Sequence, residues 1–394
     1  MLVWCAGLVS WLGNYALFIA LPVYVYETTG STLTTAVSVM AGALPRILVS
    51  QVAGVLVDRS DYRRTLLFAN LTLCGATLSF LPVLGGAWWA LLPVIVIQAS
   101  LGEFLGPAEN ALLPLLVSEK QLASANSLNA LNNYLARLFG PVLGGFLLAF
   151  TGFEAVIVMD ALSYALAALL LIWVKAPLVK RKVALQTNPY QRWFAEWTQG
   201  LCFMRSSPLL TLSLIAVALV GLGEGFISTL LVPFVEIMLA GGGLELGYIF
   251  SAQALGGVVG GFLLTAFADR VRPERLLAWG GVVSGVLLLA IFTYPLLYPV
   301  LWLAFVLTAL AGIPLTLWNT AQLTLLQTES APELRGRVFS AYFAMFSLTQ
   351  LVGMGLSGYL GERVGVWVIG VDAVTYLLSG LVAVVVMRRR REKG

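Results

Sequence analysis

Histidine is entirely absent from this chain of 394 residues, and charged residues make up only 11% of it. Without histidine there is no HExxH zinc site, Ser-His-Asp triad or histidine proton relay, so proton transfer would fall to carboxyl groups. The three cysteines, Cys5, Cys74 and Cys202, lack CxxC spacing and predict neither a disulfide framework nor a metal site. No Walker-type GxxxxGK sequence offers a nucleotide site. We therefore expect no enzyme, no metal and no cofactor.

The chain is rich in hydrophobic residues, which make up 59% of it. A helix needs roughly 20 apolar residues to cross the hydrocarbon core of a bilayer. Twelve such spans with short loops use up this length and leave no room for a soluble catalytic domain. The sequence therefore predicts an all-α membrane protein with spans at 2–26, 33–57, 65–87, 89–117, 126–150, 154–174, 209–238, 244–267, 275–293, 298–327, 337–360 and 364–387.

Basic residues gather on one side of these predicted spans. The even-numbered connections and the C-terminal tail hold nearly all of the 23 lysines and arginines, whereas the opposite loops hold only Arg363. The positive-inside rule then places both termini in the cytoplasm, and we expect a multi-pass protein of the bacterial inner membrane. The net charge of +4 follows from this topology, so it gives no reason to expect a nucleic-acid partner.

The chain contains an internal repeat. Three patterns recur 211 to 213 residues apart: Asp58-Arg59 with Asp269-Arg270, Asp160–Tyr164 with Asp372–Tyr376, and Gly140–Gly145 with Gly353–Gly358. Because each repeat has six spans, both enter the membrane in the same orientation, and an axis along the membrane normal should relate them. We expect a six-helix bundle over 1–174, a cytoplasmic linker with an amphipathic helix over 175–208, and a second six-helix bundle with a basic tail over 209–394.

The loop after the second predicted span has a glycine followed by Asp-Arg and two further arginines, namely Gly54, Asp58, Arg59, Arg63 and Arg64. This pattern resembles the signature loop of the major facilitator superfamily, and Asp269 and Arg270 repeat part of it. The resemblance implies a gating latch. In it the glycine permits close helix approach, the aspartate accepts hydrogen bonds at a helix end, and the arginines bridge to carboxylates. The alternative is a basic loop that serves topology only.

A second motif lies in the predicted fifth span and consists of Arg137, Gly140, Pro141, Gly144 and Gly145. It looks like the glycine-proline motif that this superfamily associates with exporters of the antiporter type, and this resemblance implies export. Four glycines or prolines in six residues also make a thin, bendable helix face. Ordinary close packing would therefore need the same residues.

Further segments narrow the resemblance to one branch of the superfamily, the one with macrolide-efflux proteins and the enterobactin exporter. They are Pro107–Pro114, Ala125–Leu128, Leu44–Arg46 and Leu334–Phe339. That branch commonly has a carboxylate after the glycine of the first span, but here Asn14 takes this place. An amide does not exchange a proton, so we expect no coupling site in the first span.

Carboxyl groups inside predicted spans are costly and are therefore functional candidates. Glu224, between two glycines in the seventh span, matches Asn14 in the repeat and is our leading candidate to bind a proton or a cationic substrate. Glu103 lies at a similar depth to Arg46 and Arg137, so the three could form a structural ion-paired cluster or take part in proton coupling. Asp160 and Asp372 fall on outer helices of the resembled fold, where we expect each to accept hydrogen bonds from a neighbouring helix. Asp160 stays a secondary coupling candidate.

In the resembled fold, the first, fourth, seventh and tenth spans line a central cavity. The residues expected there are Asn14, Tyr15, Phe18, Phe226, Trp318 and Asn319. Aromatic faces with few polar anchors suit a small amphipathic molecule. The resemblance implies a secondary active exporter that works by alternating access, as a monomer among membrane lipids, in exchange for protons. A lipid or lysolipid translocator of the same fold is the alternative.

Overall fold

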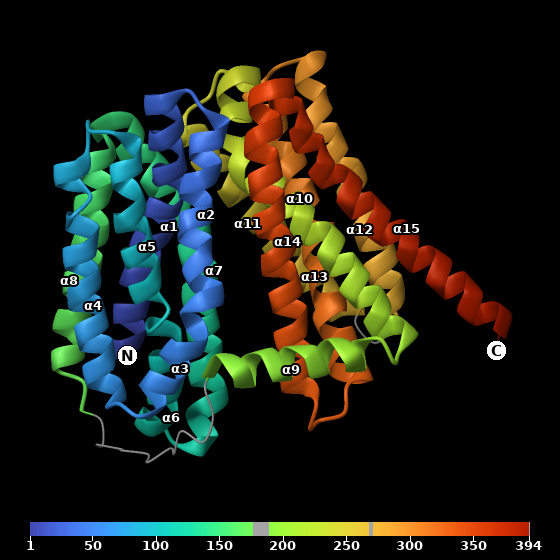
Figure 1. Ribbon diagram of the computed structural model, residues 1–394, viewed down its shortest axis with the longest axis horizontal. Helices are drawn as coiled ribbons and strands as arrows, with labels where there is room; N and C mark the ends of the chain where they lie inside the picture. Colours follow the sequence, from blue (N-terminus) through green and yellow to red (C-terminus); the bar gives the residue numbers. More distant parts are fainter. Residues whose placement is uncertain (176–188, 268–270, 394) are drawn as a thin grey trace. The chain divides into compact units, whose positions relative to one another are not determined.

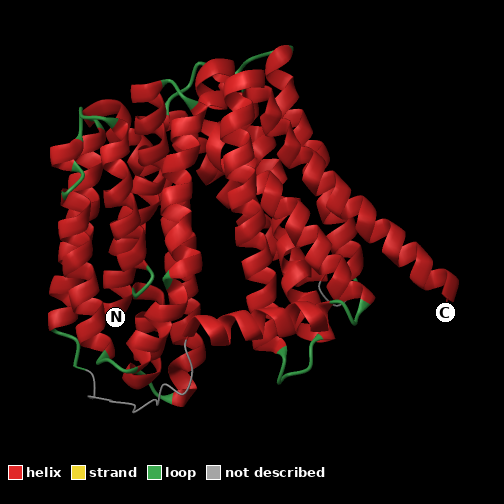
Figure 2. Cartoon of the chain, viewed as in Figure 1, coloured by secondary structure: helices red, strands yellow, loops and turns green. Residues whose placement is uncertain are grey.

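The computed structural model describes residues 1–175, 189–267 and 271–393, and within these ranges it is helical without a β-strand (Figure 2). Its helices are α1 (Leu2–Thr29), α2 (Thr32–Leu48), α3 (Ser50–Asp58), α4 (Tyr62–Leu78), α5 (Leu91–Gly102), α6 (Leu105–Leu116), α7 (Glu119–Thr151), α8 (Phe153–Ile172), α9 (Pro189–Met204), α10 (Pro208–Leu239), α11 (Gly243–Phe267), α12 (Pro273–Thr293), α13 (Leu301–Glu329), α14 (Arg335–Val364) and α15 (Gly370–Lys393), with 3-10 turns at Leu81–Val83, Trp88–Ala90, Tyr294–Leu296 and Val366–Ile369.

The predicted membrane architecture is confirmed. The described ranges hold eleven spans that are long and apolar enough to cross a membrane, or twelve if α2 and α3 are counted as one bent span. Large hydrophobic side chains such as Phe262 and Leu297 stay exposed, at 73% and 91%. An apolar surface of this extent suits lipid and would be a liability in water.

The helices form two compact units (Figure 1). Unit 1 comprises Met1–Gly30, Ser38–Tyr190 and Gly242–Ser251, and unit 2 comprises Ser31–Val37, Gln191–Gly241 and Ala252–Gly394. Unit 2 therefore contains the first turns of α2, and unit 1 contains the first turns of α11. The remaining residues of each helix belong to the other unit. The predicted division at 174 and 209 is contiguous and does not include this exchange of short segments.

The two units repeat the same packing scheme. In unit 1, α1 packs against α7 and α8, and α4 packs against α8. In unit 2, α10 packs against α14 and α15, and α12 packs against α15. The turn that follows α7 contains Gly152 at φ 88°, and the turn that follows α14 contains Gly365 at φ 93°. Both conformations favour glycine, so the repeat extends to the backbone of this turn.

The glycines of the predicted fifth-span motif lie at helix contacts. A Cβ atom on Gly140 would lie 2.5 Å from the Tyr15 Cβ, and one on Gly144 would overlap the Ala16 carbonyl of α1. Gly145 meets Gly243 at the start of α11 in the same close way. In unit 2, a Cβ on Gly353 would overlap the Leu222 carbonyl of α10. The motif thus acts here as a close-packing surface.

Two predicted spans are broken, and proline accounts for the break in the fourth. The second bends by 49° between α2 and α3, shortly after Pro45. The fourth is interrupted at Glu103 and Phe104, between α5 and α6. Pro107 has no N–H to donate to the Glu103 carbonyl, so the regular i to i−4 bond is missing there. Glu103 therefore sits at a helix break instead of within a continuous helix.

The amphipathic helix expected in the linker forms as α9, while residues 176–188 lie outside the described residues. Its second half packs on protein. Trp197, Leu201 and Phe203 lie against a buried cluster that includes Leu210 and Val338. A Cβ on Gly200 would overlap the Arg337 carbonyl of α14. This half of α9 is therefore part of unit 2, where the sequence suggested an interfacial helix.

We expect Gly353→Ala to lower the melting temperature of the purified protein, because the added methyl group has no space beside the Leu222 carbonyl. Overpacking of this kind costs about 1–3 kcal/mol. Gly261→Ala on α11 is the matched control, since a Cβ there has no neighbour within 4 Å. A thermal-unfolding assay of both variants in detergent makes the comparison. Equal melting temperatures for the two variants would show that this contact is not tight.

Candidate functional site: two matched polar clusters

The first cluster lies between α1 and α8 in unit 1. Gly13 allows α1 to approach α8 so closely that a Cβ on it would lie 2.5 Å from Asp160 Oδ1. The next residue, Asn14, accepts a hydrogen bond from the Tyr164 hydroxyl, with 2.7 Å between Oη and Oδ1. The Asn14 amide in turn donates to the Ser10 carbonyl at 3.1 Å. Glycine, amide, aspartate and tyrosine thus form one polar cluster.

The second cluster repeats this arrangement between α10 and α15 in unit 2. A Cβ on Gly223 would lie 2.7 Å from Asp372 Oδ1. Glu224 follows, and its Oε1 accepts a hydrogen bond from the Tyr376 hydroxyl at 2.9 Å. Each tyrosine occurs four residues after its aspartate and therefore lies on the same face of its helix. The clusters differ at one matched pair, where unit 1 has an amide and unit 2 has a carboxyl group.

The two aspartates are both buried, and Asp160 accepts hydrogen bonds from neighbouring helices. Its Oδ2 lies 3.4 Å from the Thr77 hydroxyl of α4 and 3.3 Å from the Gln98 amide of α5. Gln98 also donates to Thr77, at 3.1 Å. Asp160 therefore joins three helices of unit 1. Asp372 is 1% exposed, and its Oδ1 has no hydrogen-bond partner in the described part of the chain.

Trp318 completes the second cluster. Its indole N–H donates to the Ser379 hydroxyl at 3.2 Å, and its ring meets the Tyr376 ring edge-on at 5.4 Å. Trp318 and Phe226 were expected on the cavity wall, but they are only 4% and 2% exposed. In this structure both belong to the core of unit 2. Trp318 fixes the ring of the tyrosine that binds Glu224.

The other expected cavity residues are accessible to different degrees. Asn14 and Tyr15 are half-buried, and Asn319 is exposed. Phe18 is 50% exposed and meets Phe250 of unit 1 edge-on at 6.3 Å. Their role in binding a substrate stays a prediction.

Glu103 and Arg46 are close enough to interact electrostatically. The charges of Arg46 and Arg137 both interact electrostatically with the Tyr15 side chain. For Glu103, an interaction of this kind is found with Arg46 alone among the two arginines. Arg46 is therefore near Glu103, and the participation of Arg137 in an ion-paired cluster with them stays a prediction. Both arginines are exposed.

One arginine of the predicted gating loop, Arg63, contacts helix carbonyls. Arg63 donates from Nε to the Leu171 carbonyl at 3.0 Å and from Nη2 to the Ile172 carbonyl, so it binds the C-terminus of α8, and among the described residues no carboxylate binds it. A cation at this helix end is favoured by the helix dipole. Asp61, which the sequence analysis did not single out, caps α4 by accepting from the Arg64 backbone N–H at 2.7 Å.

The remaining residues of this loop include one correction. Gly54 was expected at a close helix contact, but a Cβ there would have no neighbour within 4 Å, because its side of α3 faces open space. Asp58 is exposed at the end of α3, and Arg59 follows it as the C-cap. Asp269 and Arg270 lie outside the described residues.

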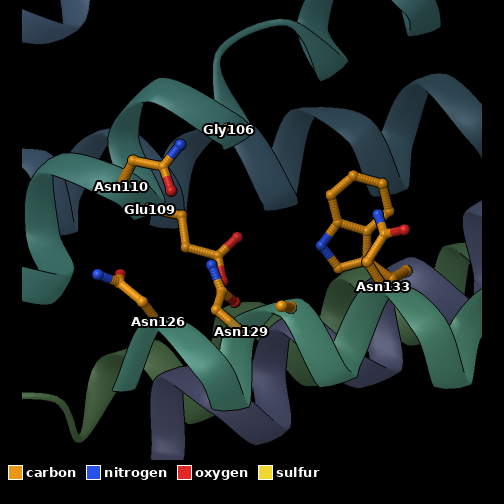
Figure 3. A pocket seen from close by; sticks show the side chains of 8 residues that line it. Gly106, Glu109, Asn110, Asn126, Asn129 and Asn133 are labelled. Atoms are coloured by element: carbon orange, nitrogen blue, oxygen red, sulfur yellow. The ribbon is translucent and has the colours of Figure 1, made fainter. Parts of the chain in front are cut away.

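A polar pocket in unit 1 was missed by the sequence analysis. It lies among α1, α6 and α7 (Figure 3), and its lining residues are Trp11, Gly106, Glu109, Asn110, Asn126, Asn129, Ala130 and Asn133. The signal that could have revealed it is the spacing of three asparagines at 126, 129 and 133, which share one face of a helix.

These features together define a helical membrane protein with two repeated units. A family model for the major facilitator superfamily matches residues 3–348 and 214–394. The chain therefore belongs to the major facilitator superfamily, and it is a transporter and not an enzyme.

Several known proteins are similar over nearly the whole chain. Macrolide efflux protein A of Streptococcus pyogenes is 26% identical, covering 96% of this chain and 91% of its own. The enterobactin exporter EntS of Citrobacter koseri is 28% identical, covering 91% and 84%. The crystal structure of a bacterial homologue of the iron transporter ferroportin, in an inward-facing state, superposes with a TM-score of 0.77 at 15% identity, covering 98% and 97%. At this identity the last likeness concerns the fold alone.

We expect Tyr376→Phe to destabilise the protein more than Tyr164→Phe. The second variant loses a bond between neutral groups, worth about 1 kcal/mol, whereas the first loses a bond to a carboxyl group, worth about 1.5–3 kcal/mol when that group is ionised. Melting temperatures of the two variants in detergent provide the measurement. The assignment of these two bonds as a matched pair would be wrong if Tyr164→Phe were the more damaging change.

Proposed function

We propose that this chain is a secondary active exporter that moves small amphipathic molecules out of the cell by alternating access in exchange for protons. One observation carries the proposal, namely the carboxyl group of Glu224 at the position where unit 1 has the amide of Asn14. The surrounding glycine, aspartate and tyrosine are the same in both clusters. Among these four matched positions, the difference is therefore confined to the residue whose side chain can exchange a proton.

The direction of transport rests on the relatives. Proteins named for macrolide efflux and enterobactin export are similar over more than 90% of this chain. Their substrates differ greatly in chemistry, so these names support export of small molecules and do not select one substrate. The distribution of basic residues supports an inner-membrane location with both termini in the cytoplasm. We propose a monomer, as in the resembled family.

The proton site is argued from the contacts of Glu224. Its Oε1 accepts a bond from Tyr376, which Trp318 holds by an edge-on ring contact. A hydroxyl donor of this kind stabilises the ionised carboxylate, while the apolar surroundings disfavour an unneutralised charge. Such a group can bind a proton from one side of the membrane and release it on the other. In this account a proton that enters from outside neutralises Glu224 as substrate leaves.

Alternating access needs helices that can shift past one another. The glycines at 223 and 225 bring α10 against α15 and α14 respectively, because Cβ atoms there would overlap Thr375 and Gln350. Glu224 therefore lies between two close helix contacts on the same helix. A movement of α10 against either neighbour changes the surroundings of the carboxyl group, and this couples protonation to conformation.

We expect Glu224→Gln to abolish accumulation of substrate driven by a pH gradient while exchange of substrate across the membrane continues. The purified protein is reconstituted in liposomes, and ethidium and a radiolabelled macrolide are the probes. The amide preserves shape and the bond from Tyr376 but holds no exchangeable proton. The loss should therefore be confined to the coupled assay.

Glu236→Gln is the matched control, since Glu236 is an exposed glutamate on the same helix α10. It should accumulate both probes as the unmodified protein does. Continued pH-driven accumulation by Glu224→Gln would exclude Glu224 as the coupling group. Loss of both coupled accumulation and exchange would place Glu224 in the movement or in substrate binding instead of in coupling.

A further inference from the structure

The polar pocket of unit 1 has a volume of about 240 Å³. Pockets that enclose whole drug-sized ligands measure roughly 300–1,000 Å³, so this one would hold a part of such a molecule. Its walls come from α1, α6 and α7, all within unit 1. The pocket is distinct from the Glu224 cluster, which belongs to unit 2.

Among the described residues that line the pocket, Glu109 alone carries a charge. Figure 3 shows its side chain extending from α6 toward Asn129 on α7. It is half-buried, and within the described ranges it has no ion-pair or hydrogen-bond partner. Gly7 leaves room beside it, because a Cβ there would lie 3.0 Å from Glu109 Oε1. A partly buried carboxyl group without a partner in the protein suits a cationic ligand.

The two arginines of the unit 1 spans, Arg46 and Arg137, do not interact electrostatically with Glu109. Arg46 interacts electrostatically with Glu103 and Tyr15, and Arg137 interacts with Tyr15. The pocket therefore has a single negative group and no positive one. Among the described residues there is also no group of three or more carboxyl or thiol side chains that could hold a metal ion. An organic cation fits this charge pattern better than an anion or a metal.

Asparagines form most of the remaining polar wall. Asn126, Asn129 and Asn133 lie along one face of α7, and Asn110 faces them from α6 (Figure 3). Each side-chain amide offers two donors and a carbonyl acceptor. Asn126 and Asn129 make no side-chain hydrogen bond in the described part of the chain. They contrast with Asn132, which is fully buried and donates to the Trp4 carbonyl at 2.9 Å.

Trp11 closes the pocket on the side of α1. Its ring stacks with that of Tyr15, with centroids 6.1 Å apart and planes at 30°. An indole face attracts a cation and also accepts the apolar face of a ring. The pocket therefore combines one carboxyl group, several amides and one aromatic wall. This set recognises a molecule that carries both a positive charge and hydroxyl groups.

We propose that this pocket binds the hydroxylated, positively charged part of an exported molecule, of the chemical class of a protonated amino sugar. Glu109 pairs with the ammonium group, the amides of Asn126 and Asn129 bind hydroxyls, and Trp11 covers the apolar face. This assignment rests on the proposed function in one respect, namely that the bound molecule is exported. The binding itself requires no transport and is tested separately.

The test uses the full-length protein in lipid nanodiscs and three matched probes, measured by isothermal titration calorimetry without a pH gradient. Hexyl glucosaminide carries the ammonium group and the hydroxyls, hexyl glucoside carries only the hydroxyls, and hexylamine carries only the charge. We expect hexyl glucosaminide to bind most tightly. Glu109→Gln should weaken it by about ten- to a hundredfold, the usual worth of a charge-assisted bond, and leave hexyl glucoside unchanged.

Glu154→Gln serves as the control, since Glu154 is an exposed glutamate of unit 1 outside the pocket. It should not alter binding of any probe. Asn129→Ala should weaken hexyl glucosaminide and hexyl glucoside alike, whereas Ser127→Ala, at an exposed position outside the pocket lining, should weaken neither. Equal affinity of the three probes, or unchanged hexyl glucosaminide binding by Glu109→Gln, would overturn the inference.

A second measurement does not depend on the folding of the Glu109 variant. Ala130→Cys, in a background of C5A/C74A/C202A, places a thiol in the pocket wall without removing an assigned binding group, and hexyl glucosaminide should slow its alkylation by a maleimide. Absence of protection at saturating probe would also overturn the inference. If hexyl glucosaminide does not bind but pH-driven accumulation is intact, only this pocket assignment is wrong. Intact binding without pH-driven accumulation removes only the proposed coupling.

Discussion

A polar group buried inside a lipid-facing helix bundle must find its partner within the protein, because the bilayer core offers none. This constraint explains why a glycine precedes the polar residue in both clusters. Gly13 and Gly223 bring two helices together, and the aspartate and tyrosine of the second helix then surround the residue that follows. Replacing either glycine with a larger residue would separate the tyrosine from Asn14 or Glu224.

The same constraint applies to the one matched position at which unit 1 has an amide and unit 2 has a carboxyl group. In unit 1 the neutral amide of Asn14 accepts the hydrogen bond of Tyr164. The aspartate of this unit accepts hydrogen bonds from Thr77 and Gln98. In unit 2 a carboxyl group accepts the bond of Tyr376. The Oδ1 atoms of both aspartates lack a hydrogen-bond partner among the described residues, so the units differ in the amide or carboxyl group that accepts from the tyrosine. We infer a division of roles, in which unit 2 carries the proton and the pocket of unit 1 binds the substrate headgroup.

Much of the fold was predictable because lipid imposes a simple pattern of long apolar runs, and the repeat followed from Asp160–Tyr164 and Asp372–Tyr376. Residue contacts were harder to predict. Gly54 matches a motif but has no close neighbour here, and Phe226 and Trp318 face the core because helix rotation is not set by span number. The asparagine face was missed because the fifth span was expected to begin at 126, whereas α7 begins at Glu119. Asn126 and Asn129 then looked like residues at a helix end.

The central claim is that Glu224 is the group that gains and loses a proton. Infrared difference spectroscopy of the protein in lipid bilayers tests it most directly, by recording the band of protonated carboxyl groups as the pH is changed. We predict one component of this band that appears on acidification, shifts in Tyr376→Phe because the hydrogen bond is lost, and is missing in Glu224→Gln, while the contributions of the other carboxyl groups remain. An unaltered band in Glu224→Gln would contradict the account.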